Sequence, residues 1–219
     1  MEYLFIQNLK KTWQSSTKKI SVDFSLRVEE GTMVALLGHS GSGKSTVLKL
    51  IAGLIPPDKC EETKVFLNDK NIINLPARKR GIGFVSQSPA LFGHMRVDDN
   101  VAYGLRCRGL SKKESRYRAE SLLERFSLSG FASRYPDSLS GGEAQRVSLA
   151  RTLIVEPKLI LFDEPLSALD KKLRQQLALD ICKMQKDWNF TGIFVTHDEN
   201  EAKIVASKTI HMKDGKIIH

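Results

Sequence analysis

The sequence predicts an α/β fold with a parallel sheet at its core, an antiparallel β subdomain near the N-terminus and an inserted helical subdomain. Three observations predict it. Apolar residues alternate with polar ones from Ile20 to Val28, as in a half-buried strand. Short apolar runs at Met33–Leu37, Leu159–Phe162 and Ile193–Val195 are typical of strands covered on both faces. Helical patterns lie between these runs, which indicates a parallel α/β core.

The remaining elements follow in chain order. Tyr3–Leu9 and Val65–Leu67 join the alternating run in the predicted antiparallel sheet. Ser111 and Glu114 have the spacing of a capping box, and a helical apolar face follows them. That face consists of Ala119, Leu122, Leu123 and Phe126. A later stripe, which we interpret as core packing, consists of Leu173, Leu177, Ile181, Met184 and Trp188.

These patterns predict one domain over residues 1–219. Its α/β and antiparallel core takes residues 1–88 and 155–219, and the helical subdomain takes residues 89–154. A chain of 219 residues with 41% hydrophobic residues is long enough and apolar enough for one well-filled core.

The formal net charge of +9 leaves three interpretations open. These interpretations are a solvated basic surface, attraction to acidic phospholipid headgroups, and binding to nucleic acid. The basic residues are scattered along the chain, which argues against a dedicated DNA-reading face. Charge alone therefore does not identify the partner.

The location of the chain is expected to be cytosolic. No apolar run approaches the roughly 20 residues that cross a bilayer, and Met1–Ile6 does not resemble a secretory signal. Cys60, Cys107 and Cys182 are odd in number and far apart, which predicts reduced thiols and no disulfide or zinc framework.

A phosphate-binding loop is the most specific motif. Gly38–Ser45 reads GHSGSGKS and fits G-x-x-x-x-G-K-[ST], between a buried strand and the helical run Thr46–Ala52. Its backbone N–H groups and the helix N-terminus are suited to phosphate. We expect Lys44 to reach the β- and γ-phosphates of ATP and the Ser45 hydroxyl to ligate Mg²⁺.

A second glycine-rich loop, Leu139–Glu143, also opens into a helical pattern. Its Ser140 hydroxyl and the backbone N–H groups of Gly141 and Gly142 form a second phosphate-binding surface. Two such surfaces in one small domain suggest an ATPase that closes two copies over shared ATP.

Two carboxylates follow the apolar run that ends at Phe162. Ligands gather at the C-terminal ends of strands in an open parallel sheet. We therefore expect Asp163 to hold Mg²⁺ through its water shell and Glu164 to polarise the attacking water as general base. Two solvated acids at a strand end are the alternative.

These motifs resemble, in family order, the ATP-binding subunits of ABC transporters, and the resemblance covers nearly the whole chain. Leu139–Glu143 resembles the signature loop, Ser167–Asp170 the D-loop, and His197 the switch histidine. Gln87 stands where the family has its Q-loop glutamine, and Trp13 where it has an aromatic residue stacked on adenine. The resemblance implies a P-loop NTPase core of the ABC ATPase type.

The resemblance and the motifs together imply a set of site residues. The expected catalytic residues are Lys44, Gln87, Glu164 and His197. The expected magnesium ligands are Ser45, Gln87 and Asp163. The expected nucleotide-binding residues are Trp13, Gly38, His39, Ser40, Gly41, Ser42, Gly43, Lys44, Ser45, Thr46, Ser140, Gly141, Gly142 and Asp170.

Some of these residues have simpler interpretations, and the chain departs from the family at two places. His197 can also be interpreted as an ordinary surface histidine, and Trp13 as a residue that only packs against its neighbours. Asp170 can be interpreted as the N-cap of the following helix, and this is compatible with a role at a dimer seam. Glu143 replaces the glutamine common at the end of the signature, and the segment 60–64 lacks the usual glycine.

Within this family, the chain resembles the ATP-binding subunits of importers most specifically. One cassette without long coiled coils or membrane spans implies a separate ATPase subunit that docks on an integral membrane permease at the cytoplasmic face of the membrane. Leu75–Gly83, Ala90–Met95 and Pro165–Asp170 resemble the subgroup that serves polyamines, ferric iron, sulfate and thiamine. A second copy, and indirectly a solute-binding protein, are the other expected partners. The alternative is a non-transport ABC ATPase that acts with nucleic acid or another protein complex; we expect no nucleic acid.

Overall fold

The computed structural model describes residues 2–14 and 19–218, which divide into two compact units. The first unit is made of Met1–Phe84, Lys158–Glu164 and Ala178–His219. The second unit is made of Val85–Pro157 and Pro165–Leu177. The segment 89–154, for which the sequence predicts a helical subdomain, lies wholly in the second unit.

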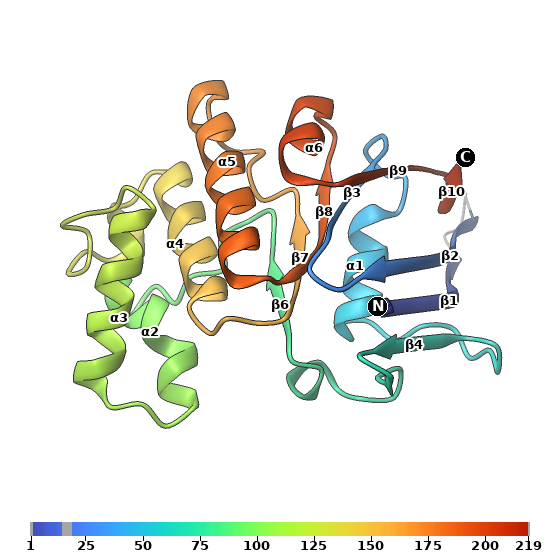
Figure 1. The fold of residues 1–219 in the computed structure, drawn as a ribbon, viewed down its shortest axis with the longest axis horizontal. Helices are drawn as coiled ribbons and strands as arrows, with labels where there is room; N and C mark the ends of the chain where they lie inside the picture. The colour runs from blue at the N-terminus through green and yellow to red at the C-terminus, as the bar shows by residue number, and fades with distance from the viewer. Residues whose placement is uncertain (1, 15–18, 219) are drawn as a thin grey trace. The chain divides into compact units, whose positions relative to one another are not determined.

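Strands begin and end the described chain, and helices follow one another in its middle (Figure 1). The strands are β1 (Glu2–Gln14), β2 (Lys19–Glu29), β3 (Met33–Leu37), β4 (Lys64–Leu67), β5 (Lys70–Asn71), β6 (Ile82–Val85), β7 (Leu159–Asp163), β8 (Thr191–Thr196), β9 (Lys208–Lys213) and β10 (Lys216–Ile218). The α-helices are α1 (Lys44–Ala52), α2 (Val97–Cys107), α3 (Lys112–Arg125), α4 (Gly141–Leu153), α5 (Lys171–Trp188) and α6 (Glu199–Val205). Two 3₁₀ helices are η1 (Ala77–Lys79) and η2 (Pro136–Ser138).

Two sheets build the first unit, to which all their strand residues except Val85 belong. One is four-stranded and antiparallel, in the order β2-β1-β4-β5. The other is six-stranded, in the order β10-β9-β3-β8-β7-β6, and pairs β3 in parallel with β8 and β9, and β7 with β8. The predicted antiparallel sheet and parallel core are confirmed.

Helix α1 packs against both sheets, because it contacts β7 of one and β2 of the other. Its side chains Val47, Leu48, Leu50 and Ile51 are fully buried. The helix begins at Lys44, two residues before the predicted start at Thr46. The phosphate-binding loop therefore runs directly into the helix, and the helix axis is fixed by the core.

One arginine of the first unit is buried among backbone carbonyls. Arg80 donates hydrogen bonds to Leu50 and Ile51 at the end of α1, and to Ile73 and Leu75 in the loop before η1. Burial lowers the pKa of Arg80. This arginine therefore stabilises the C-terminal end of α1 and adds little to the basic surface.

The second unit is helical, and α2, α3 and α4 pack against one another. Ser111 caps α3 by accepting a hydrogen bond from the N–H of Glu114 at 3.2 Å, as the spacing predicts. The four apolar residues predicted for one face of this segment are buried: Ala119, Leu122, Leu123 and Phe126. Helix α5 begins in the second unit and ends in the first, and its predicted stripe is buried at Leu177, Ile181 and Met184.

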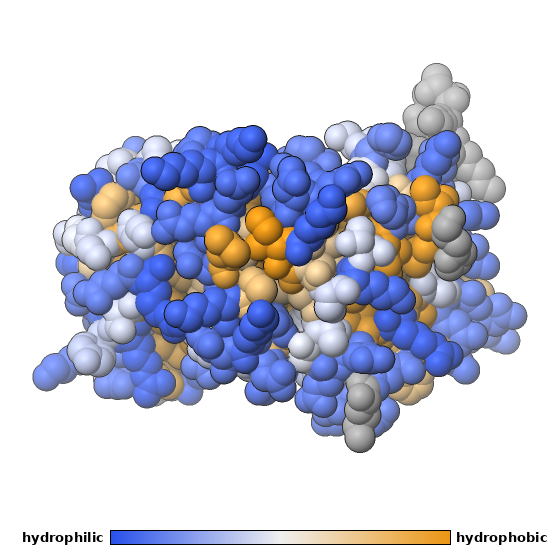
Figure 2. Space-filling model, turned by 45° about the horizontal axis from the view of Figure 1, so that its top comes forward, coloured by the Kyte–Doolittle hydropathy of each residue, from blue (hydrophilic) through white to orange (hydrophobic). Residues whose placement is uncertain are grey.

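The exposed large apolar side chains of the described residues are Trp13, Leu54, Tyr103, Tyr117, Tyr135, Leu179 and Ile218. The face drawn in Figure 2 is predominantly hydrophilic, with small hydrophobic areas between the polar side chains. Among residues 2–14 and 19–218, no helix combines the length and the apolar character needed to cross a bilayer.

Candidate functional site

The loop between β3 and α1 is folded around a buried lysine. Lys44 Nζ donates hydrogen bonds of 2.8 Å to the carbonyls of Gly38 and His39. Burial lowers the pKa of Lys44, and the nearby carboxylates of Glu164 and Asp163 oppose this shift. His39 takes part through its backbone, while its side chain is exposed. The loop therefore holds the ammonium group of Lys44 against two of its own carbonyls.

Two glycines allow this loop to form. A Cβ at Gly38 would run into the carbonyl of Met212, so the loop approaches the end of β9 closely. Gly41 has a φ of 81°, which side chains rarely adopt, and an added Cβ there would point into open space. The geometry leaves room for phosphate beside the loop, so the residues present fit a nucleotide.

A serine and an aspartate from different elements meet next to Lys44. Ser45 Oγ, in the first turn of α1, donates a 2.6 Å hydrogen bond to Oδ1 of Asp163 at the end of β7. Burial raises the pKa of Asp163, and the hydrogen bond from Ser45 and the charge of Lys49 lower it less.

These two oxygen donors fit Mg²⁺, which keeps several waters and takes one or two carboxylates together with substrate phosphates. In the described part of the chain, no group of three or more His, Cys, Asp or Glu side chains could hold a metal by itself. The donor set therefore suits an ion that arrives with a nucleotide, rather than a resident metal.

The residue after Asp163 is held in an unusual backbone conformation. Glu164 has a φ of 46°, and its N–H donates to the carbonyl of Val195 at 3.1 Å. Its Oε2 lies 3.5 Å from Nδ1 of His197, which follows β8. The Glu164 side chain is 17% exposed and that of His197 is 56% exposed. Residues in such backbone regions concentrate at functional sites.

The structure brings together five of the predicted site residues in the first unit: Lys44, Ser45, Asp163, Glu164 and His197. Other predicted residues belong to the second unit: Gln87, Ser140, Gly141, Gly142 and Asp170. Gln87 lies in an exposed turn that Ser86 closes with a 2.6 Å hydrogen bond from its hydroxyl to the carbonyl of Ser88.

The second glycine-rich loop forms a complete capping box at the start of α4. Ser140 Oγ accepts from the N–H of Glu143, and Glu143 Oε2 accepts from the N–H of Ser140 at 2.7 Å. The hydrogen bond from the Ser140 backbone is the largest cause that lowers the pKa of Glu143. Glu143 thus has a local structural role, and the available signal was its capping-box spacing from Ser140.

Asp170 and Trp13 have simple structural environments. Asp170 Oδ1 accepts from the N–H of Leu173 at 3.0 Å, so the N-cap interpretation is confirmed. Trp13 on β1 is 37% exposed, and Nζ of Lys11 lies 5.9 Å from the centre of its ring. An exposed indole is available for stacking, and its contact with adenine stays a prediction.

Sequence reasoning missed a buried asparagine in the second unit. Asn100 Nδ2 donates to the carbonyls of Phe92, Met95 and Arg96 at 3.0–3.1 Å, and its Oδ1 accepts from the N–H of Phe92 at 2.8 Å. One side chain therefore holds the loop between Phe92 and Arg96. The available signal was a polar residue within the apolar pattern of α2.

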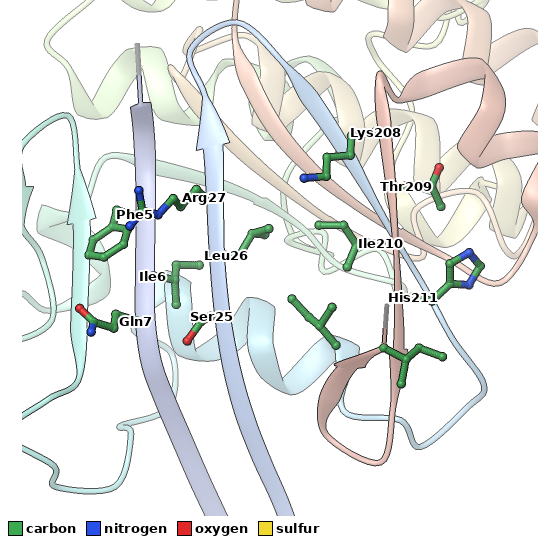
Figure 3. Close-up of a pocket in the computed structure, with 12 residues that line it drawn as sticks. Phe5, Ile6, Gln7, Ser25, Leu26, Arg27, Lys208, Thr209, Ile210 and His211 are labelled. Atoms are coloured by element: carbon green, nitrogen blue, oxygen red, sulfur yellow. The ribbon is translucent and has the colours of Figure 1, made fainter.

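Each unit also contains a hollow on its surface. In the first unit, a hollow of about 660 Å³ is lined by β1, β2, β9 and β10, and Leu26 points toward Ile210 across it while His211 points away (Figure 3). In the second unit, a hollow of about 560 Å³ is lined by Met95, Tyr103, Arg106, Cys107, Gly109, Leu110 and Lys112. Neither hollow includes a predicted site residue.

Replacing Asp163 by asparagine is expected to stabilise the protein without ligands by about 1 kcal/mol at neutral pH, because a buried charge is removed while Ser45 keeps an acceptor. The raised pKa of Asp163 adds stability that is present at low pH and is lost as the pH rises above about 4, through the folded pKa. Asp163→Asn should lack this loss. Urea unfolding at several pH values measures it.

Asp99 provides a control of opposite sign. The side-chain hydrogen bonds from Arg116, at 2.9 and 2.6 Å, lower the pKa of Asp99 most. Its contribution is present above the unfolded pKa and is lost as the pH falls, so Asp99→Asn should destabilise the protein by about 1 kcal/mol at neutral pH. Equal effects of the two variants would contradict the argument.

Comparisons with known proteins agree with this geometry. The profile of the family described as ABC transporter matches residues 22–167. The chain is 45% identical over 211 residues to the Fe(3+) ions import ATP-binding protein FbpC of Agrobacterium fabrum, covering 96% of this chain and 58% of that protein. It is 48% identical over 195 residues to the sulfate/thiosulfate import ATP-binding protein CysA of Synechococcus elongatus, covering 89% of this chain and 56% of that protein.

A solved structure is also similar over nearly the whole chain. It is the dimeric post-hydrolysis state of the ATP-binding cassette MJ0796 bound to ADP and Pi, with a TM-score of 0.90 and 32% identity. The match covers 99% of this chain and 97% of the other. By contrast, the chain spans less than two thirds of the length of the two import proteins.

Proposed function

The chain belongs to the ABC transporter family, and we propose that it is the ATP-binding and ATP-hydrolysing subunit of a membrane importer. The convergence of Lys44, the Ser45–Asp163 pair and the Glu164–His197 pair carries this proposal. A cation, a pair of oxygen ligands and a carboxylate beside an imidazole are the groups that phosphoryl transfer to water needs.

The residues divide the reaction between them. Lys44 and the N–H groups from Gly38 to Thr46 bind the phosphates of ATP, and Ser45, together with Asp163 through its water shell, would hold Mg²⁺. When bound, Mg²⁺ neutralises charge on the phosphate oxygens. Glu164 accepts a proton from the attacking water, and His197 orients Glu164 and the γ-phosphate.

A second copy of the chain completes the proposed site. Ser140–Gly142 of one copy contacts the ATP held by the other, Asp170 lies at the seam, Trp13 stacks on adenine, and Gln87 ligates Mg²⁺ or orients water. Support comes from the open space around Gly141, the exposed turn at Gln87 and the dimeric state of the similar cassette.

The proposed partner is an integral membrane permease, which places the subunit at the cytoplasmic face of the membrane. The hollow lined by Met95, Tyr103 and Leu110 lies beside the loop that Asn100 holds, and it is suited to receive a helix of the permease. The names of the similar import proteins favour ferric iron or sulfate within the expected set, which also includes thiamine and polyamines.

Phosphate release from ATP by the purified chain tests the ATPase function, and we expect hydrolysis that requires Mg²⁺. Reconstitution with the cognate permease, a solute-binding protein and a panel of ferric iron, sulfate, thiamine and polyamines tests transport. We expect one loaded binding protein to stimulate hydrolysis. Salt-sensitive binding of nucleic acid without any such stimulation would favour the non-transport alternative.

A further inference from the structure

Two side chains of α4 reach the turn that carries Gln87. Gln145 Nε2 donates a 3.0 Å hydrogen bond to the carbonyl of Ser86. Arg151 Nη1 donates a 2.6 Å hydrogen bond to the carbonyl of Ala90. These two carbonyls lie on either side of Gln87, so α4 holds the turn at both ends. All of these residues belong to the second unit.

The burial of Gln145 makes an unfavourable contribution to the free energy of folding. Its side chain is fully buried, and within the described residues its Oε1 has no hydrogen-bond partner. A buried amide with an unsatisfied oxygen is less favourable than an apolar side chain of similar size. The contribution of Gln145 therefore lies in the hydrogen bond from Nε2 to the turn, and not in packing.

Arg151 makes the second attachment. Its guanidinium lies 5.5 Å from the centre of the Phe92 ring, in addition to its hydrogen bond to Ala90. Arg151 is partly buried, and this burial lowers the pKa of its guanidinium. Asn100 holds the next stretch from Phe92 to Arg96. The segment without regular structure between β6 and α2 is thus fixed by side chains of two helices.

The same helix begins at the proposed phosphate contact. Ser140 is the N-cap of α4, Gln145 follows in its second turn, and Arg151 lies in its last turn. A helix of 13 residues moves as a stiff body over this length. Any displacement of Ser140 is therefore passed through Gln145 and Arg151 to Gln87.

We propose that Gln145 and Arg151 are positioning residues. They hold Gln87 in a fixed position relative to Ser140–Gly142 at the N-terminal end of α4, so that the two move together. Contact of ATP with Ser140–Gly142 then sets the position of Gln87, and contact with Gln87 sets the position of Ser140–Gly142. The inference rests on the proposed ATPase function, in which Gln87 serves the ATP bound to its own copy and Ser140–Gly142 contacts the ATP bound to the partner copy, so that α4 links the two sites of the dimer.

The test combines kinetics with backbone dynamics. Gln145→Leu should lower kcat about tenfold and leave the KM for ATP nearly unchanged, because it misplaces Gln87 without touching the P-loop. In the Gln87→Ala background, the same change should have no further effect on kcat. Without nucleotide, ¹⁵N order parameters of the amides of residues 87, 88, 90 and 91 should fall from about 0.85 to below about 0.6.

Gln185→Leu is the matched control. Gln185 is also buried and donates to two backbone carbonyls, those of Gly31 and Phe190, but it lies in the first unit. It should lower Tm while leaving kcat and the order parameters of residues 87, 88, 90 and 91 unchanged. If Gln145→Leu does not fold, Arg151→Met, at a less buried position, should show the same kinetic and dynamic changes.

Additive effects of Gln145→Leu and Gln87→Ala, or unchanged order parameters in both Gln145→Leu and Arg151→Met, would overturn the inference. Failure of the proposed function is distinguishable from this result. In that case the wild-type chain does not hydrolyse ATP, and the order parameters alone decide whether α4 holds the turn.

Discussion

Glu164→Gln is expected to lower kcat for ATP hydrolysis by about 10³-fold while ATP binding is retained. The glutamine keeps the size of the side chain and its hydrogen-bonding capacity, but it cannot accept a proton from water. Backbone geometry also places Glu164, through the φ of 46° and the hydrogen bond to Val195, and a glutamine keeps both. The variant should therefore keep the geometry of the site and accumulate as an ATP-bound dimer.

Single-turnover phosphate release and size-exclusion chromatography with ATP measure the two effects. Glu156→Gln is the matched control, because Glu156 is an exposed acid with a similar φ of 48°. That control should hydrolyse ATP at the wild-type rate. Near-normal turnover by Glu164→Gln would remove Glu164 from its role as general base.

Mixing two inactive variants is expected to restore activity. Lys44→Met loses the cation of the P-loop, and Gly141→Asp places a carboxylate where the partner's phosphate should bind. Each alone should lose hydrolysis at least about 100-fold. In an equal mixture, half of the dimers pair one copy of each, and one of their two sites is intact. About a quarter of the wild-type rate should therefore return.

Gly141→Asp is suited to this experiment because its fold should be intact. An added Cβ at Gly141 meets no atom within 4 Å, and an acidic side chain in the first turn is favourable at a helix N-terminus. Native mass spectrometry with ATP confirms that mixed dimers form. If mixed dimers are present and no activity returns, the two motifs do not share one ATP.

The sequence predicted those parts of the fold that depend on local patterns. The continuous apolar runs became β3, β7 and β8 of the parallel sheet, and the alternating run became β2. The P-loop motif predicted the position of Lys44 because its glycines, strand and helix are all adjacent in the chain. The sequence also predicted membership of the ABC transporter family and the ABC ATPase fold, and both predictions are confirmed.

Contacts between distant residues could not be predicted in this way. Gln145 meets a carbonyl 59 residues away, and Arg151 meets one 61 residues away. Arg80 looks like part of a basic surface run in the sequence, yet backbone carbonyls surround it. No periodicity encodes such pairings, since they follow from how the helices pack. Glu143 differs from these residues, because its spacing from Ser140 is the capping-box spacing that predicted the cap of α3.

The loop that Asn100 holds has a thermodynamic consequence for assembly. Its four hydrogen bonds hold Phe92–Arg96 in place in the chain by itself, without the proposed permease. Ordering a free loop upon binding would consume part of the interaction free energy, so a loop that is already ordered binds more tightly for the same contact area. Docking on this surface then approaches rigid-body association, and the strength of the complex is set mainly by how slowly it dissociates.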